Sequence, residues 1–349
     1  MKLCVIVPAK DEGLVIAKTL ENLLEAKVPP EDIFVIDDGS SDGTGVIAKS
    51  YGVNVLRNEV NIGKAESITL IVSSFDLTSH YELIALMDAD TKVDSEYFVN
   101  ICQSFTKDEK VVVVCGHTKS AEHNWLTSYR AVSYFISHFV YKMGQHKMGV
   151  ITVAPGCSTT YRSSIFLDLK WDSDTLVEDM DVTVQVHRKK LGKIAYQEKS
   201  VVYTQDPKTL KDYIKQMYRW NVGTWQVLRK YSVLTGFKKI DWEYKLLIGE
   251  GMIFSIIYVL LPLWLILFTK VTLLIILLEL SFSFVVAAIV AIIEKRKDLL
   301  FVFPLFILMR YLDCVLMLYS FWNVIIRRKS ILTWFSADRY THSTERSKT

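Results

Sequence analysis

Three long apolar stretches in the last third of the chain place the strongest constraint on its fold. They run over residues 246–268, 271–293 and 299–322. A helix of about 20 apolar residues crosses a hydrocarbon core of about 30 Å, and each stretch reaches that length. The mean hydropathy of +0.23 is high for a soluble protein, and the excess lies in these stretches. We expect a membrane domain of three apolar helices over residues 246–323.

Apolar strands alternate with helical patterns in the first half of the chain, which favours an α/β domain with a mostly parallel sheet covered on both faces. The expected strands cover residues 3–7, 33–36, 53–56 and 82–87, and the expected helices cover 13–26, 43–51, 64–75 and 95–105. The first apolar run is too short for a signal peptide. We expect this domain to span residues 1–230, and a polar tail to occupy residues 324–349.

The charge and the cysteines argue against several classes of function. The net charge is +3, and lysines and arginines are spread among acidic residues, so we expect no nucleic-acid partner. The five cysteines show no CxxC spacing and no neighbouring histidine cluster. Neither a zinc site nor a disulfide framework is indicated, and the cysteines fit a reducing compartment.

Two carboxylates follow the apolar run 83–87 one residue apart, in the segment Asp88-Ala89-Asp90. Carboxylate oxygens suit Mg²⁺ or Mn²⁺, and Mg²⁺ usually takes one or two carboxylates and completes its shell with water and substrate phosphates. The pattern therefore suggests a metal site for a nucleotide diphosphate. Taken alone, such a pair at a strand end is also often a solvated turn.

Acidic loops also follow the first and second expected strands. The first runs from Pro8 to Glu12, and the second begins with Asp37 and Asp38. The second loop alone could be a turn with helix caps, because Asp, Gly and Ser favour turns. Open α/β sheets bind ligands beyond the carboxyl ends of their strands, so we expect the three acidic loops to converge.

Together with the segment Asn61-Ile62-Gly63-Lys64, these loops resemble the family 2 glycosyltransferases of the GT-A fold over residues 3–225. The resemblance implies a Rossmann-like, mostly parallel sheet and inverting transfer of a sugar from a nucleotide diphosphate sugar, with a UDP-sugar expected. It implies that Asp90 binds Mg²⁺ or Mn²⁺. It also implies that the donor is bound by Pro8, Glu12, Asp37, Asp38, Lys64, Asp88 and Ala89.

Lys64 stands at the expected start of a helix. A cation is poorly placed at the positive end of a helix dipole unless an anion shares the site, and a diphosphate would supply that anion. The alternative is an exposed lysine with no ligand.

The segment Glu178-Asp179-Met180-Asp181 places three carboxylates in four residues. It resembles the acidic catalytic motif of membrane polysaccharide synthases, which implies that Asp179 is the general base and that Glu178 lies beside it in the site. Val177 stands where the commoner motif has threonine. The alternative is an acidic helix start stabilised by the dipole, and both interpretations can hold.

The loop 154–162 resembles the family's loop on the acceptor side of the donor pocket. The residues carried over to that role are Gly156, Cys157, Tyr161 and Arg162. Cys157 has no identifiable base partner, so we expect a small buried cysteine rather than a nucleophile.

The segment Gln216-Met217-Tyr218-Arg219-Trp220 carries the Gln-x-x-Arg-Trp signature of the same enzymes. Positions i, i+3 and i+4 are neighbours on a helix, so Gln216, Arg219 and Trp220 would face a diphosphate and a sugar together. The alternative is an amphipathic helix at the membrane surface over residues 206–230. We expect both, with Trp220 also on the acceptor side.

The orientation of the membrane domain follows from the donor. Nucleotide sugars are cytosolic, so we expect a multi-pass protein of the cell membrane with a cytoplasmic catalytic domain and loop 294–298 inside. With three spans the basic cluster 327–329 would lie outside, against the positive-inside tendency. We therefore expect one stretch to be interfacial or re-entrant, most plausibly the last, whose Arg310 and Asp313 need partners.

The sequence favours an enzyme similar to hyaluronan, chitin, cellulose and poly-N-acetylglucosamine synthases, which extends a polysaccharide at the membrane. Three spans are few for a polymer channel unless the chain forms a homo-oligomer. The alternative is a single-addition enzyme that glycosylates a lipid acceptor. A catalytically silent membrane scaffold is a third hypothesis, which the complete set of motifs disfavours.

Overall fold

The computed structural model describes residues 1–121, 123–332 and 337–340. The remaining positions of the expected polar tail lie outside the described residues. The chain divides into two compact units: the first contains Met1–Ala121, Ser137–Gln205 and Arg339–Thr349, and the second contains Glu122–Ile136 and Asp206–Asp338. Residues 206–230, which were expected to belong to the first domain, lie in the second compact unit, because α10 (Leu210–Lys230) packs against α14 (Leu305–Phe321).

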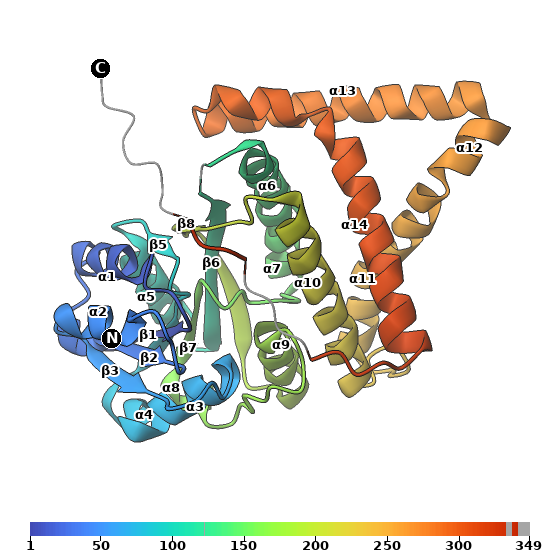
Figure 1. Cartoon of the computed structure of the whole chain (residues 1–349). Coiled ribbons are helices and arrows are strands. Elements are labelled where there is room, and N and C mark those ends of the chain that lie inside the picture. Colours follow the sequence, from blue (N-terminus) through green and yellow to red (C-terminus); the bar gives the residue numbers. More distant parts are fainter. Residues whose placement is uncertain (122, 333–336, 341–349) are drawn as a thin grey trace, which may run out of the picture. The chain divides into compact units, whose positions relative to one another are not determined.

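An eight-stranded sheet forms the centre of the first unit, in the order β3-β2-β1-β4-β7-β6-β8-β5 (Figure 1). The strands are β1 (Leu3–Ala9), β2 (Ile33–Asp37), β3 (Asn54–Arg57), β4 (Leu83–Leu86), β5 (Lys92–Val93), β6 (Val111–Ser120), β7 (Thr159–Arg162) and β8 (Lys193–Thr204). The first four strands in this order, β3, β2, β1 and β4, pair in parallel, as do β6 and β8. Strands β7 and β5 are antiparallel to their neighbours. The predicted mostly parallel α/β fold is confirmed.

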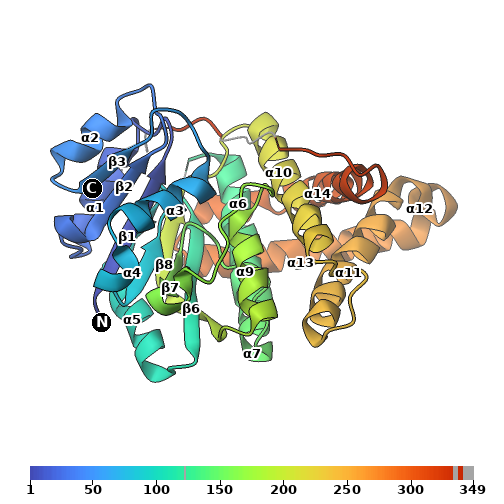
Figure 2. The same ribbon diagram turned by 90° about the horizontal axis from the view of Figure 1, so that it is seen from below.

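Both faces of this sheet are buried, because successive side chains of a strand point to opposite faces. In β1, Val5 and Val7 pack toward α1 and α2, whereas Cys4 and Ile6 pack toward α3. Figure 2 shows these helices on opposite sides of the first strands. The helices of this unit are α1 (Ile16–Glu25), α2 (Thr44–Ser50), α3 (Lys64–Ser74), α4 (Leu77–His80), α5 (Tyr97–Lys107), α7 (Met143–Met148), α8 (Ser163–Phe166) and α9 (Glu178–Lys189).

The second unit is helical. Besides α10 and α14 it contains α6 (Trp125–Ile136), α11 (Lys239–Val259), α12 (Leu261–Leu267) and α13 (Thr269–Ile293). Two helices among the described residues are long and apolar enough to cross a membrane, Thr269–Ile293 and Leu305–Ile326. The first expected stretch is instead broken into α11 and α12, with a bend of 50° (Figure 1).

The break lies in the first stretch, whereas the sequence pointed to the last one as the irregular stretch. Pro262 explains the position of the break, since it has no N–H to donate to Tyr258 one turn earlier. The ionisable residues of the last stretch have the partners that were expected. The Nη1 of Arg310 lies 2.7 Å from Oε1 of Glu279, and Asp313 accepts a hydrogen bond of 2.8 Å from the Tyr213 hydroxyl.

Candidate active site

The three acidic loops meet at the carboxyl ends of β1, β2 and β4, as predicted. The N–H of Asp38 donates to the carbonyl of Ala9 at 2.9 Å, and the N–H of Glu12 donates to the Thr44 hydroxyl at 2.9 Å. Since β1 lies between β2 and β4, the loops lie where the strand order reverses, which is the usual ligand position in an open α/β sheet.

The two aspartates after β2 hold the loops in place. The carboxylate of Asp38 accepts hydrogen bonds of 2.9 Å from the N–H groups of Ile62 and Gly63, and therefore anchors the turn that begins α3. Asp37 accepts from the N–H of Ser40 at 2.8 Å. The structure thus gives both residues a loop-anchoring role, and their contact with a nucleoside stays a prediction.

Lys64, the first residue of α3, joins two of the predicted carboxylates. Its Nζ lies 2.6 Å from Oδ1 of Asp88 and 3.0 Å from Oε1 of Glu178. Burial works against the lysine charge, but these two carboxylates outweigh it and raise the pKa of Lys64 well above its usual value. The structure thus brings together three of the predicted site residues from segments far apart in the sequence, and their role in binding a donor stays a prediction.

Asp179 has the geometry and the proton affinity of a base. Its Oδ2 accepts from the N–H of Gly156 at 3.2 Å, and its Oδ1 accepts from the N–H of Met180 at 2.7 Å. Burial, followed by the charge of Glu178, raises the pKa of Asp179 to about 6, against the opposing effect of Lys64. A base that is ionised at neutral pH but retains affinity for a proton suits general base catalysis.

Gly156 leaves room for this arrangement. A Cβ at this position would lie 3.1 Å from Nζ of Lys64 and 3.7 Å from Oε1 of Glu178. A side chain would therefore push the lysine away from its two carboxylates.

Asp90 is the predicted metal ligand, and one of its oxygens fits that role. The residue is 6 % exposed, and among the described residues its Oδ1 has no hydrogen-bond partner. An unsatisfied buried carboxylate oxygen is costly without a ligand. No cluster of three or more metal-ligating side chains occurs in the described part of the chain. The residues therefore fit a Mg²⁺ or Mn²⁺ ion that takes its other ligands from water and diphosphate.

Arg339 is a member of the site that the sequence did not indicate. Its Nη1 donates to Oδ2 of Asp90 at 2.5 Å, and its Nε donates to Oε2 of Glu12 at 2.7 Å, while Nη2 donates to the other oxygen of Glu12. Burial raises the pKa of Glu12 to about 7, although Arg339 opposes this shift. Arg339 lies 249 residues from Asp90 in a tail with no recognisable motif, so no local pattern pointed to it.

The predicted acceptor-side residues divide into two groups. Gly156 and Cys157 lie at the site, and burial followed by the charge of Asp88 raises the pKa of the Cys157 thiol to about 12, which agrees with a non-nucleophilic cysteine. Tyr161 is only 1 % exposed and packs in the core against Phe166 and Trp171.

Three other predicted residues have contacts within the first unit, two of them in the sheet and one with helix α1. Arg162 donates from Nε to the carbonyl of Val111 at 2.7 Å. Pro8 lies opposite Ile36 in the sheet, and the carbonyl of Ala89 accepts from Thr19 at 2.6 Å. The structure gives Tyr161 and Arg162 a role in packing and in strand β7, so their place on the acceptor side stays a prediction.

Gln216, Arg219 and Trp220 lie on one helix, α10, as predicted, and belong to the second unit. The guanidinium of Arg130 lies 5.2 Å from the centre of the Trp220 ring, and its Nε lies 2.9 Å from Oδ1 of Asp206. The buried pair therefore holds a cation against the face of the signature tryptophan.

Residues 2–223 match the model of the family described as glycosyltransferase like family 2. A poly-β-1,6-N-acetyl-D-glucosamine synthase of Staphylococcus epidermidis is 27 % identical over 224 residues, covering 62 % of this chain and 53 % of the relative. A probable glycosyltransferase of Bacillus subtilis, YdaM, is 28 % identical over 242 residues, covering 66 % and 57 % respectively. The chain thus spans about half the length of these curated relatives.

Among solved structures, the mannosyltransferase PcManGT of Pyrobaculum calidifontis, in complex with GDP-Man and Mn²⁺, superposes with a TM-score of 0.58 at 16 % identity. The match covers 92 % of this chain and 87 % of the mannosyltransferase. At this identity the likeness concerns the fold, and it agrees with the predicted GT-A architecture.

Proposed function

This chain belongs to glycosyltransferase family 2, and from that premise we propose that it transfers a sugar from a UDP-sugar to a growing polysaccharide at the membrane, with inversion at the anomeric carbon. The observation that carries the proposal is the convergence of Asp88, Lys64 and Glu178 beside Asp179 at the carboxyl edge of the sheet. Asp179, the proposed base, lies beside this cluster of charged groups, which would suit a nucleotide sugar.

In the proposed reaction Asp179 takes the proton of the acceptor hydroxyl. The acceptor oxygen then forms a bond to the anomeric carbon from the side opposite the diphosphate, and the bond between that carbon and the diphosphate oxygen breaks. The N–H groups of Gly156 and Met180 fix the carboxylate of Asp179 during this step. The nucleoside diphosphate leaves with the electron pair.

The charge of the site supports a metal requirement. Five carboxylates of the described site lie around two cations, Lys64 and Arg339, and they belong to Glu12, Asp88, Asp90, Glu178 and Asp179. An anionic diphosphate would be repelled by this surplus. Mg²⁺ or Mn²⁺ held by Asp90 would supply positive charge to the leaving diphosphate.

The number of candidate membrane spans helps to choose between a polysaccharide acceptor and a lipid acceptor. Two or at most three candidate spans occur in the described residues, which is few for enclosing a polymer within one chain. This observation favours the second candidate function, a single addition to a lipid acceptor. With either acceptor, Asp179 would take the proton of the acceptor hydroxyl in the same way.

The test begins with the purified chain in detergent and a panel of donors: UDP-glucose, UDP-N-acetylglucosamine, UDP-glucuronate and GDP-mannose. We expect release of UDP from one uridine donor only when Mg²⁺ or Mn²⁺ is added. Release from none of them, with any metal, would contradict the proposal. Gel analysis of radiolabelled products then distinguishes a polymer ladder from a single product extracted into organic solvent.

A further inference from the structure

The guanidinium of Arg339 occupies the centre of the predicted metal and donor site. It joins Glu12 through two nitrogens and Asp90 through the third, which is the strongest geometry available to an arginine and two carboxylates. Glu12 and Asp90 are both buried, so solvent screens these pairs little.

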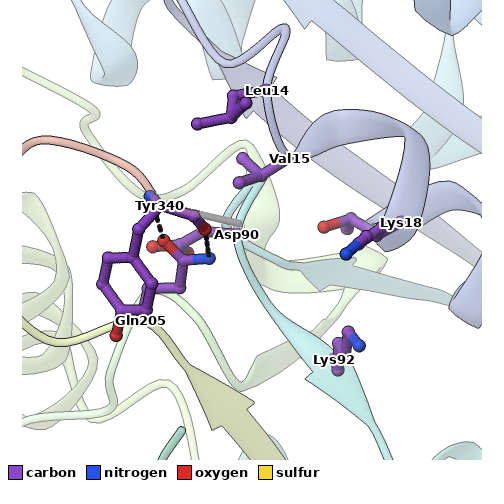
Figure 3. Close-up of a pocket in the computed structure, with 8 residues that line it drawn as sticks. Leu14, Val15, Lys18, Asp90, Lys92, Gln205 and Tyr340 are labelled. Atoms are coloured by element: carbon purple, nitrogen blue, oxygen red, sulfur yellow. Dashed lines mark hydrogen bonds between the residues drawn. The ribbon is translucent and has the colours of Figure 1, made fainter. Parts of the chain in front are cut away.

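The segment that carries Arg339 is also fixed by uncharged bonds. The carbonyl of Tyr340 accepts from Nε2 of Gln205 at 2.7 Å, and the N–H of Tyr340 donates to Oε1 of Gln205 at 3.3 Å. Figure 3 shows Gln205 and Tyr340 lying against each other next to Asp90. Tyr340 is buried, so residues 339 and 340 are docked on the first unit by two independent sets of contacts.

A guanidinium and a divalent cation compete for one carboxylate. Oδ2 of Asp90 is taken by Arg339, and a dication on Oδ1 would lie within a few ångströms of the arginine charge in a buried site, where repulsion is strong. We propose that Arg339 is an internal cation which occupies the metal-binding carboxylate before the donor arrives, and that binding of the metal displaces residues 339 and 340. The segment then acts as a self-inhibitory strap.

This inference rests on the proposed function, because it takes Asp90 to be the metal ligand. It also gives Arg339 a purpose that the transfer reaction does not require. The strap keeps Glu12 and Asp90 paired with a cation, and so limits the electrostatic cost of holding two buried carboxylates in the empty site.

The test measures binding of Mn²⁺ alone to the full chain in detergent, from the electron paramagnetic resonance signal of free Mn²⁺. Arg339→Ala should lower the Kd for Mn²⁺ by about tenfold, because one competing charge is removed. Gln205→Ala releases Tyr340 without changing any charge and should lower the Kd by a smaller factor. Lys193→Ala removes an exposed charge paired with Asp108 and should leave the Kd unchanged.

Hydrogen exchange of the Tyr340 amide provides a second measurement on the unaltered chain, and it should become faster when Mn²⁺ is added. An unchanged or higher Kd in Arg339→Ala, together with unchanged exchange at Tyr340, would overturn the inference.

Asp90→Asn separates this failure from a failure of the proposed function. If Asp90→Asn binds Mn²⁺ as well as the unaltered chain does, the metal assignment is refuted and the strap with it. If Asp90→Asn loses Mn²⁺ binding but Arg339→Ala binds Mn²⁺ no more tightly than the unaltered chain, Asp90 remains the metal ligand and only the strap is refuted.

Discussion

At the scale of single residues, the charges around Asp179 determine how strongly its carboxylate binds a proton. The carboxylate is buried beside Glu178, and its pKa is raised to about 6, yet two N–H groups hold it as an ionised acceptor. Asp179→Asn removes the base while keeping the shape of the side chain. We expect the rate of transfer to fall by about 10²- to 10⁴-fold with nucleotide binding retained. Steady-state kinetics and a nucleotide titration measure the two quantities.

The control for this change is Asp168→Asn, which neutralises an exposed carboxylate of the same unit. It should transfer sugar at the rate of the unaltered chain. Full turnover in Asp179→Asn would show that another group takes the proton.

The pH dependence of transfer provides a second residue-scale prediction. Asp179 must be ionised to act, so kcat/KM should rise with pH through a midpoint near its pKa of about 6. Lys64 lowers that pKa, and Lys64→Met should therefore raise it and move the midpoint to higher pH. Lys193→Met, which removes a distant exposed charge, should leave the midpoint in place. A midpoint that stays fixed or moves down in Lys64→Met would contradict the electrostatic coupling.

The sequence was informative about residues whose position follows from strand ends. Glu12, Asp38 and Asp88 lie in the loops that follow β1, β2 and β4, so the topology of an open sheet predicts that these loops meet. Arg339 reaches the same site through a tail that has no periodic pattern, and only the folded chain brings it there. Tyr161 shows a packing role that the resemblance did not indicate, because it belongs to strand β7 and is buried in the core.

At the scale of elements, the first four strands were predicted well and the last four were not predicted. α3 begins at Lys64 as expected, and strands β1 to β4 agree with prediction to within two residues at their ends. Strand β5 has only two residues, too few to carry a periodicity, and β6, β7 and β8 lie in segments for which no strand was predicted. The bend between α11 and α12 was also missed, although Pro262 marks it, because apolar composition alone was used to define the stretch.

The packing of α6 on α10 yields a prediction about stability. Arg130 on α6 pairs with Asp206 and lies over the rings of Tyr134 and Trp220. Arg130→Gln leaves the buried Asp206 without its cation, and breaking a buried pair in this way costs about 3–5 kcal/mol. We expect thermal unfolding in detergent to shift down by several degrees.

The control is Lys239→Ala, which breaks an exposed pair with Glu243 on α11. Such a pair contributes little, so the unfolding temperature should not change. If both variants unfold at the same temperature, the buried pair does not stabilise the second unit.

The path of the whole chain limits how many times it crosses the membrane. The chain leaves the first unit after Gln205 and returns to it at Arg339, and Tyr340 is hydrogen-bonded to Gln205. If the intervening segment crosses a membrane, its two ends begin and finish on the same side, so we predict an even number of crossings. We therefore do not expect three full crossings. We also predict that the basic cluster 327–329 lies inside, in agreement with the positive-inside tendency.

A second contact identifies the helices that cross. The hydroxyl of Ser128 on α6 donates to Oδ2 of Asp298 at 2.7 Å. The segment 122–136 leaves and re-enters the first unit within 15 residues, too few to cross a membrane and return. We therefore predict that Asp298 lies on the same side as residues 327–329. We expect α11–α12 and α13 to form the crossing pair and α14 to remain at the interface, as predicted for the last apolar stretch.

Cysteine labelling in intact cells tests this topology. With the catalytic unit in the cytoplasm, Lys297→Cys and Arg328→Cys should react with a membrane-impermeant reagent only after permeabilisation, because both positions lie inside. Lys270→Cys, in the first turn of α13, should react from outside and serves as the positive control. Labelling of Arg328→Cys in intact cells would mean an odd number of crossings. Arg339 and Glu12 would then face opposite sides of the membrane, and the docking of the strap would be impossible in the membrane-bound protein.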